Sequence, residues 1–172
     1  MNVLLSREQI AEAVARMGQQ ISRDFAGQSV VLIGVLKGAV FFLSDLARQI
    51  ELDATFDFIA VRSYGTQKET TGEVQLIKDV TTPLRDVNVI LVEDILDTGL
   101  TLTFLKKHFL AHQPRAVRIA ALLDKPSRRA ASVEADYVGF RIPDKFVVGY
   151  GLDFAERYRN LQDICILEDV SG

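Results

Sequence analysis

Three short runs made up almost entirely of apolar residues constrain the fold of this chain more than any other feature. They lie at residues 29–36 (SVVLIGVL), 87–92 (VNVILV) and 117–123 (VRIAALL). Because apolar residues do not alternate with polar ones there, each run is typical of a strand buried on both faces. Residues 39–50 and 100–111, which stand between the runs, have the apolar spacing of helices. This alternation predicts an α/β fold in which helices flank a central parallel sheet of about five strands.

The remaining segments predict one more helix and several shorter strands. Ser6 and Gln9 form a capping box, and an apolar stripe at helical spacing follows before Gly27: Ile10, Val14, Met17, Ile21 and Phe25. Strands are expected at residues 55–62, 74–78, 137–140, 146–150 and 164–167. Residues 65–73 (GTQKETTGE) contain no apolar side chain, so we expect a loop there, at the tip of a long hairpin.

Length and charge narrow the class of protein. The 172 residues suit a single domain, 1–172, in which apolar residues make up 48% and no disulfide is needed for folding. The formal net charge of −3 argues against a nucleic acid as the main partner, because phosphate backbones require a basic face. The first residues hold too short an apolar run for a signal peptide or a membrane span, so we expect a cytoplasmic protein with no membrane partner.

Cysteine and histidine, which often bind metals or take part in catalysis, are scarce in this chain. The single cysteine, Cys165, lies in an apolar run and is interpreted as a small buried side chain rather than a nucleophile. His108 and His112 are four residues apart in a predicted helix, a spacing that could hold a metal ion. No His-Glu-x-x-His pattern accompanies them, so we interpret them as part of a solvated helix end.

The most informative segment for function is residues 89–102, VILVEDILDTGLTL. A buried strand ends there in Glu93 and Asp94, Asp97 follows, and a Thr-Gly turn then opens a helix. In an open parallel sheet, ligands bind beyond the carboxyl ends of the strands, which is where we expect these acids. The backbone N–H groups of residues 98–101 lie at the start of the helix and favour an anion, and the threonines of this turn add hydroxyl donors.

Carboxylates beside an anion site are compatible with it if the two bind different parts of one ligand. Neighbouring carboxylates accept hydrogen bonds from ribose hydroxyls and can bind Mg²⁺, whereas backbone amides bind phosphate. The segment therefore predicts a site for a phosphorylated sugar. The plainer alternative is an acidic, solvent-exposed strand end with Asp97 as the N-cap of the helix.

The same segment resembles the phosphoribosyl diphosphate (PRPP) motif of type I phosphoribosyltransferases, and the chain resembles the bacterial hypoxanthine-guanine branch of that family. Four more segments agree, in family order: residues 36–38 (LKG), 63–65 with 71–74 (SYG, TGEV), 122–125 (LLDK) and 138–153 (VGFRIPDKFVVGYGLD). The resemblance implies the type I phosphoribosyltransferase fold, with a small hood subdomain built from the N-terminal helix and the residues after about 125. It also implies a homodimer or homotetramer.

The implied activity is that of a glycosyltransferase (pentosyltransferase) in purine salvage and IMP biosynthesis. The 5-phosphoribosyl group would pass from PRPP to N9 of hypoxanthine or guanine, giving IMP or GMP and pyrophosphate. Mg²⁺ would neutralise the leaving pyrophosphate, held mainly by PRPP with help from Glu93, Asp94 and Asp153. Asp97 is implied as the general base near N7 or N9 of the purine.

The resemblance assigns PRPP to one set of residues: Lys37, Gly38, Ser63, Tyr64, Glu93, Asp94, Thr98, Gly99, Leu100, Thr101 and Arg159. Within it, a loop with a cis Leu36–Lys37 peptide would bind pyrophosphate through its amides, Arg159 would contact pyrophosphate, and Ser63 with Tyr64 would form the tip of a lid. Leu100 stands where many family members have a lysine. The plainer alternatives are a simple turn, an exposed arginine and an ordinary hairpin tip.

A second set is implied for the 6-oxopurine: Ile95, Lys125, Phe146, Val147 and Asp153. Lys125 would donate to the exocyclic O6, Phe146 would stack on the base, and the backbone of Val147 would meet the base edge. The plainer alternatives are that Lys125 is a surface lysine and that Phe146 and Val147 belong to a core strand. Asp153 would then be a turn carboxylate after the glycines of residues 149–151.

Two other classes of protein fit the chain less well. A regulator that uses the same fold to bind PRPP or nucleotides usually lacks the catalytic acid or has a basic face, whereas this chain keeps Asp97 and is slightly acidic. A P-loop or dinucleotide-binding domain is also disfavoured. The chain has no G-x-x-x-x-G-K-[ST] sequence, and residues 149–151 lack the third glycine of a dinucleotide fingerprint.

Overall fold

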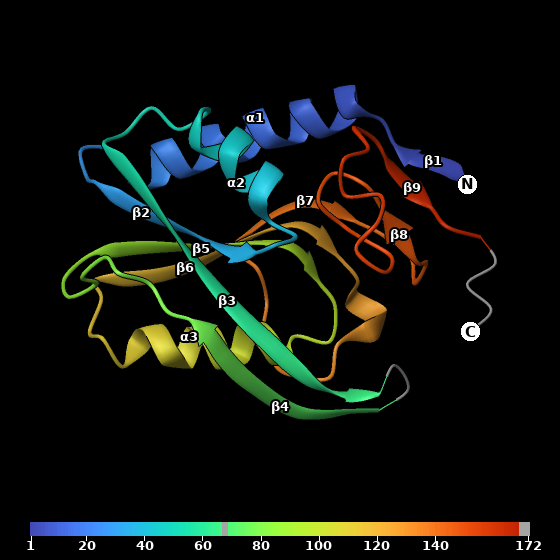
Figure 1. Cartoon of the computed structure of the whole chain (residues 1–172). Helices are drawn as coiled ribbons and strands as arrows, with labels where there is room; N and C mark the ends of the chain where they lie inside the picture. The colour runs from blue at the N-terminus through green and yellow to red at the C-terminus, as the bar shows by residue number, and fades with distance from the viewer. Residues whose placement is uncertain (67–68, 169–172) are drawn as a thin grey trace.

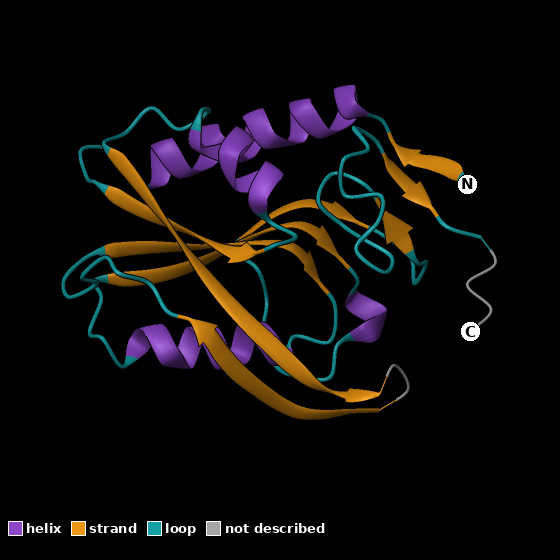
Figure 2. Cartoon of the chain, viewed as in Figure 1, coloured by secondary structure: helices purple, strands orange, loops and turns teal. Residues whose placement is uncertain are grey.

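The computed structural model describes residues 1–66 and 69–168, and for 64–66 and 69–72 it describes the backbone alone. A six-stranded sheet forms the centre of the molecule, in the order β4-β3-β2-β5-β6-β7 (Figures 1 and 2). Its strands are β2 (Val30–Leu36), β3 (Ala54–Thr66), β4 (Glu69–Lys78), β5 (Asn88–Leu96), β6 (Ala116–Asp124) and β7 (Tyr137–Arg141). Five of them are parallel, as predicted, and β4 joins the edge antiparallel to β3.

Helices cover both faces of this sheet. Figure 1 shows α1 (Arg7–Asp24) and α2 (Val40–Ala47) on one face and α3 (Leu100–Leu110) on the other. The capping box at Ser6 is present, and the predicted apolar stripe of α1 is buried along its whole length. The apolar residues of α1 and α2 share one core cluster, and those of α3 belong to a second one across the sheet. The α/β prediction is therefore confirmed.

A small antiparallel sheet lies beside the main one and joins the two ends of the chain. It consists of β1 (Asn2–Leu5), β9 (Ile164–Ile166) and β8 (Val147–Val148), in that order. The helix that was expected in the hood, α1, packs against α2 and β7 on the main sheet, and the hood itself stays a prediction. The N-terminal segment contributes its strand β1 instead. Cys165 is buried in β9, as predicted, and burial raises the pKa of its thiol.

The predicted loop at residues 65–73 is mostly strand. β3 continues to Thr66 and β4 begins at Glu69, with Gly65 paired to Thr70. Residues 67 and 68 lie outside the described residues. The hairpin itself is confirmed, and Figure 1 shows it extending past the rest of the sheet. Polarity misled the prediction because backbone pairing between two strands does not require apolar side chains.

β5 extends further toward its carboxyl end than predicted, and it includes the acidic residues. The expectation ended the strand before Glu93, but β5 continues through Glu93 and Asp94 to Leu96. A connection then leads through Gly99 into α3. Among the described helices, none is long and apolar enough to cross a membrane.

Candidate active site

A cavity of about 360 Å³ opens at the carboxyl ends of β2 and β5. Most of the residues predicted to bind PRPP line it: Lys37, Gly38, Ser63, Glu93, Asp94, Thr98, Gly99, Thr101 and Arg159. Asp97, Ile95 and Asp153 line it as well. The side chain of Tyr64 lies outside the described residues, and Leu100, the first residue of α3, does not line the cavity.

Glu93 and Asp94 are buried at the end of β5, not exposed beyond it. Their residues are 7% and 9% exposed. The Asp94 amide donates to Glu93 Oε1 at 3.3 Å, and the Ile95 amide donates to Asp94 Oδ1 at 2.8 Å. Burial raises the pKa of both carboxyl groups, and for Glu93 the neighbouring charge of Asp94 raises it further. A buried acid pair of this kind favours a polar or cationic ligand that replaces the lost water.

Two glycines allow the backbone to close around Asp94. A Cβ added to Gly38 would lie 1.9 Å from Asp94 Oδ2, and one added to Gly151 would lie 2.0 Å from the Gly38 carbonyl oxygen. The expected cis peptide between Leu36 and Lys37 is present. The Lys37 ammonium pairs with Glu156 at 2.9 Å on the surface. The loop at residues 36–38 is therefore packed directly against the acid pair.

The turn that opens α3 requires glycine and is held from behind. Gly99 is the N-cap of α3 with φ 86°, and a Cβ there would lie 2.5 Å from Val133 Cγ1. The Thr98 carbonyl oxygen accepts hydrogen bonds from the amides of Ala130 and Ala131, at 2.8 and 3.1 Å. Arg129 donates to the Asp97 carbonyl oxygen at 2.6 Å. The first N–H groups of α3 are thus held facing the cavity, where they suit an anion.

Asp97 is not the N-cap of α3, so the plainer alternative for this residue is wrong. Its side chain is 40% exposed and forms an ion pair with Arg128, whose Nε lies 3.1 Å from Asp97 Oδ1. Arg128 and Arg129 were missed from the sequence, where only the bare Ser-Arg-Arg pattern after Pro126 could have signalled them. These two arginines hold the side chain and the backbone of the same aspartate.

Arg159 enters the cavity from the connection that follows β8. Its Nη1 donates to the Gly151 carbonyl oxygen at 2.7 Å, and Nη2 lies 3.2 Å from Asp153 Oδ1 and 3.1 Å from Glu156 Oε1. Its Nε is buried and has no hydrogen-bond partner within the part of the chain that the structure describes. A buried guanidinium nitrogen without a partner costs free energy, which an anionic ligand in the cavity would offset.

Of the five residues predicted to bind the purine, Ile95 and Asp153 line this cavity, whereas Lys125, Phe146 and Val147 lie outside it. Lys125 follows β6, is 7% exposed rather than on the surface, and its Nζ lies 3.8 Å from Asp144 Oδ1. Phe146 is 44% exposed and its ring meets that of Phe154 edge-on at 5.8 Å. Val147 is buried in β8, paired with Ile166. The purine role of Lys125, Phe146 and Val147 therefore stays a prediction that the cavity itself does not test.

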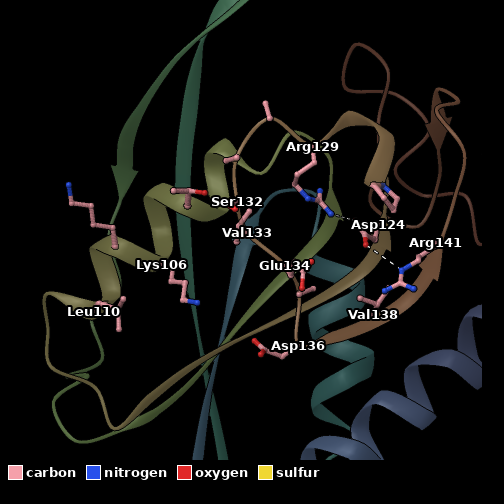
Figure 3. Close-up of a pocket in the computed structure, with 16 residues that line it drawn as sticks. Lys106, Leu110, Asp124, Arg129, Ser132, Val133, Glu134, Asp136, Val138 and Arg141 are labelled. Carbon is pink, nitrogen blue, oxygen red and sulfur yellow. Dashed lines mark hydrogen bonds and ion pairs between the residues drawn. The ribbon is translucent and has the colours of Figure 1, made fainter.

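A larger hollow of about 1350 Å³ lies between α3, residues 129–136 and β7 (Figure 3). Figure 3 shows Arg129 and Arg141 directed at Asp124. Arg129 Nη2 pairs with Asp124, and Arg141 Nε lies 3.8 Å from it. Glu93, Asp94 and Asp97 do not line this hollow. Arg129, which does line it, also donates to the Asp97 carbonyl oxygen beside the smaller cavity.

The carboxylates of the smaller cavity suit Mg²⁺. Glu93, Asp94 and Asp153 offer only oxygen, the donor that Mg²⁺ prefers, and a cation would offset the burial of the β5 acids. These three are not among the groups of three whose ligand atoms all lie within 4.8 Å of one another in the described residues. The arrangement therefore fits an ion that takes most of its ligands from a bound substrate and water.

Comparisons with known proteins agree with this geometry. Residues 2–155 match the phosphoribosyl transferase domain family. A hypoxanthine-guanine phosphoribosyltransferase of Bacillus subtilis is 45% identical over 166 residues, covering 96% of this chain and 92% of the relative. One from Mycobacterium bovis is 46% identical over 173 residues, covering 97% and 86%. A crystal structure of a hypoxanthine-guanine phosphoribosyltransferase from Bacillus anthracis, with HEPES in its active site, has a TM-score of 0.94 and 53% identity, covering 97% of this chain and 98% of that one.

Proposed function

The chain belongs to the phosphoribosyltransferase family, and from that premise we propose that it is a purine salvage enzyme. It transfers the 5-phosphoribosyl group of PRPP to N9 of hypoxanthine or guanine, releasing pyrophosphate and forming IMP or GMP. The observation that carries this proposal is that the buried Glu93–Asp94 pair, the first turn of α3 and Arg159 line one cavity. Carboxylates that can bind a sugar and backbone amides that can bind a phosphate thereby lie side by side in this cavity.

PRPP occupies the cavity with its parts sorted by charge. Glu93 and Asp94 accept hydrogen bonds from the ribose hydroxyls, while the N–H groups and hydroxyls of Thr98 and Thr101 bind the 5-phosphate. The pyrophosphate lies against the loop amides at residues 37–38. One of its oxygens accepts a hydrogen bond from the unpaired Nε of Arg159. In this pose the acids touch no phosphate, so like charges stay apart.

Mg²⁺ is the proposed cofactor. Asp153 would hold it directly or through water, with Glu93 and Asp94 nearby, and the ion would neutralise charge on the leaving pyrophosphate. Arg159 shares this task from the protein side, because its Nη2 already contacts Asp153. These contacts orient PRPP so that the sugar carbon faces the incoming base.

Asp97 acts as the general base for the purine proton. Arg128 contacts Oδ1, and we assign Oδ2 to the N7 or N9 proton of the base. Holding the carboxylate by one oxygen fixes its direction and leaves the other to receive the proton. Arg129, which holds the Asp97 carbonyl oxygen, keeps the backbone of this turn still.

The purine binds between the cavity and the small sheet. The Lys125 ammonium donates to O6, which selects 6-oxopurines because the 6-amino group of adenine is itself a donor. The exposed face of Phe146 stacks on the base, and the Val147 backbone and Ile95 meet its edges. The small sheet acts as the hood of this single domain. The working assembly is a homodimer or homotetramer in the cytoplasm, with neither nucleic acid nor membrane as partner.

The test is direct. Incubating the protein with Mg²⁺, PRPP and hypoxanthine should give IMP and pyrophosphate in equal amounts. Competition between hypoxanthine, guanine and xanthine at fixed PRPP then ranks the bases. Binding of PRPP without formation of any nucleotide would overturn the proposal and favour a regulatory protein on the same fold.

A further inference from the structure

Three metal-ligating side chains meet at the far end of α3, away from the proposed active site. They are Asp79, which directly follows β4, and His108 and His112 in and after the last turn of α3. One ligand atom from each lies within 4.8 Å of the others, the only such trio of His, Cys, Asp or Glu side chains among the described residues. The trio differs from the active-site acids because two of its three ligands are imidazoles.

The spacing of these atoms suits one tetrahedral ion. His108 Nε2 lies 3.0 Å from Asp79 Oδ1, and the two imidazole rings are 5.3 Å apart between centroids. Ligand atoms at about 2.1 Å from a tetrahedral Zn²⁺ are separated by about 3.4 Å. Small rotations of exposed side chains are therefore enough to bring all three into the first coordination sphere. His112 lies two residues beyond Leu110, the last residue of α3, and its ring still meets that of His108.

Two of the ligands are already held in place. The Val80 amide donates to Asp79 Oδ1 at 2.8 Å, and the His108 ring stacks on Phe104 at 6.3 Å with an interplanar angle of 6°. Asp79 Oδ1 thus faces both the Val80 amide and the His108 ring, which fixes the direction of the carboxylate. His112 is exposed and free to turn toward the other two.

We propose that Asp79, His108 and His112 bind one divalent transition-metal ion, of the class of Zn²⁺. Imidazole nitrogen favours Zn²⁺, Ni²⁺ or Cu²⁺ and disfavours Mg²⁺, which prefers oxygen. Three protein ligands leave a fourth position for water. This site is separate from the proposed Mg²⁺ site, since His108 lies about 13 Å along α3 from Gly99 and His112 lies beyond the end of the helix.

The ion would join two elements that are distant in sequence. Asp79 ends the β3–β4 hairpin, whereas the histidines end the helix whose first turn lines the proposed PRPP cavity. Metal bound there clips the base of the hairpin to α3. The expected effect is greater stability of the folded protein, because the complete ligand set exists only after folding.

The experiment titrates ZnCl₂ into tag-free protein by calorimetry, with a constant excess of MgCl₂ that competes at sites offering oxygen ligands alone. We expect about one equivalent of Zn²⁺ per chain and a rise in Tm of several degrees. His112→Gln should lose that equivalent and the rise in Tm. Lys107→Gln, an exposed change on the same turn that removes no ligand, should retain both.

The readouts keep a folding defect apart from a binding defect. His112 is exposed, so His112→Gln should match the parent in circular dichroism and in Tm when EDTA is present. Asp79→Asn keeps the shape of the side chain and removes the one ligand that follows β4, so it should also weaken Zn²⁺ binding. Equal Zn²⁺ binding by the parent and His112→Gln, or none by the parent, overturns the proposal and leaves the proposed transferase activity untouched.

Discussion

The two halves of the proposed site are built in different ways. The PRPP half comes largely from one stretch, residues 93–101, and its acids are buried and packed against backbone. The purine half takes Ile95 from that stretch and its other residues from the segment between Lys125 and Asp153, and its aromatic ring, Phe146, is 44% exposed. The first half therefore depends mainly on one stretch of backbone, whereas the second depends on side chains from several elements.

This difference teaches where substitutions should act. In the PRPP half a Cβ at Gly38 or Gly99 would overlap its neighbours, so any side chain at these two positions would disturb the backbone. In the purine half, side chains can be shortened without moving the chain. We therefore expect KM for PRPP and KM for the purine to respond to different residues.

The largest effect should come from Asp97→Asn. The amide keeps the shape of the carboxylate and a weaker contact with Arg128, but it cannot accept the purine proton. We expect kcat to fall about 100-fold or more, with both KM values little changed. Steady-state formation of IMP measures this, and a variant as fast as the parent would remove Asp97 from the mechanism.

Lys125→Met separates the halves most cleanly. It preserves the length of a buried side chain but removes the donor to O6. A hydrogen bond from a charged group contributes ~1.5–3 kcal/mol, so KM for hypoxanthine should rise about 30-fold while KM for PRPP stays within about twofold. The exposed neighbour offers a matched control, since Lys145→Met should alter neither constant. A comparable rise in both constants would break the division of the site.

Glu93→Gln should weaken PRPP binding yet stabilise the empty protein. Replacing one carboxyl oxygen with an NH2 donor removes one of the two acceptors offered to the ribose hydroxyls, so KM for PRPP should rise about tenfold. Because burial raises the pKa of Glu93 above its ordinary value of 4.5, the folded state holds a proton that the unfolded state releases. The stability of the parent therefore falls as pH rises from 4.5 through the raised pKa, and the variant avoids this loss.

Thermal unfolding at several pH values checks the second part of this prediction. Glu93→Gln should have the higher Tm at neutral pH, and the difference should vanish below about pH 4.5, where both the folded and unfolded parent are protonated. Asp97→Asn should show no such gain, because Asp97 is partly exposed and paired with Arg128. A lower Tm for Glu93→Gln at neutral pH would contradict the account of the buried acid pair.

Phe146→Leu should have the smallest effect. Stacking of a base on an aromatic ring contributes ~1–3 kcal/mol, and leucine retains part of the contact, so KM for hypoxanthine should rise about fivefold. Phe56→Leu, at an exposed phenylalanine on β3, is the matched control and should change nothing. An unchanged KM for Phe146→Leu would mean that the base lies elsewhere on the small sheet.

Much of the PRPP half could be predicted because its chemistry is local. The acids, the glycine and the threonines of residues 93–101 are contiguous, and the main chain alone brings them to one sheet edge. The purine half gave weaker signals. A lysine after a strand is usually on the surface, and only the fold shows that Lys125 is buried beside Asp144.

Apolar patterning by itself determined the α/β class and the stripe of α1, because strands buried on both faces are continuous apolar runs and the buried face of a helix repeats every three to four residues. Only the tertiary structure decided that β5 runs through its acids and that Arg128 and Arg129 hold Asp97. Only folding, too, brought Asp79 to the histidines of α3. These outcomes depend on contacts between residues far apart in the chain, and no local pattern encodes which charged side chains will meet.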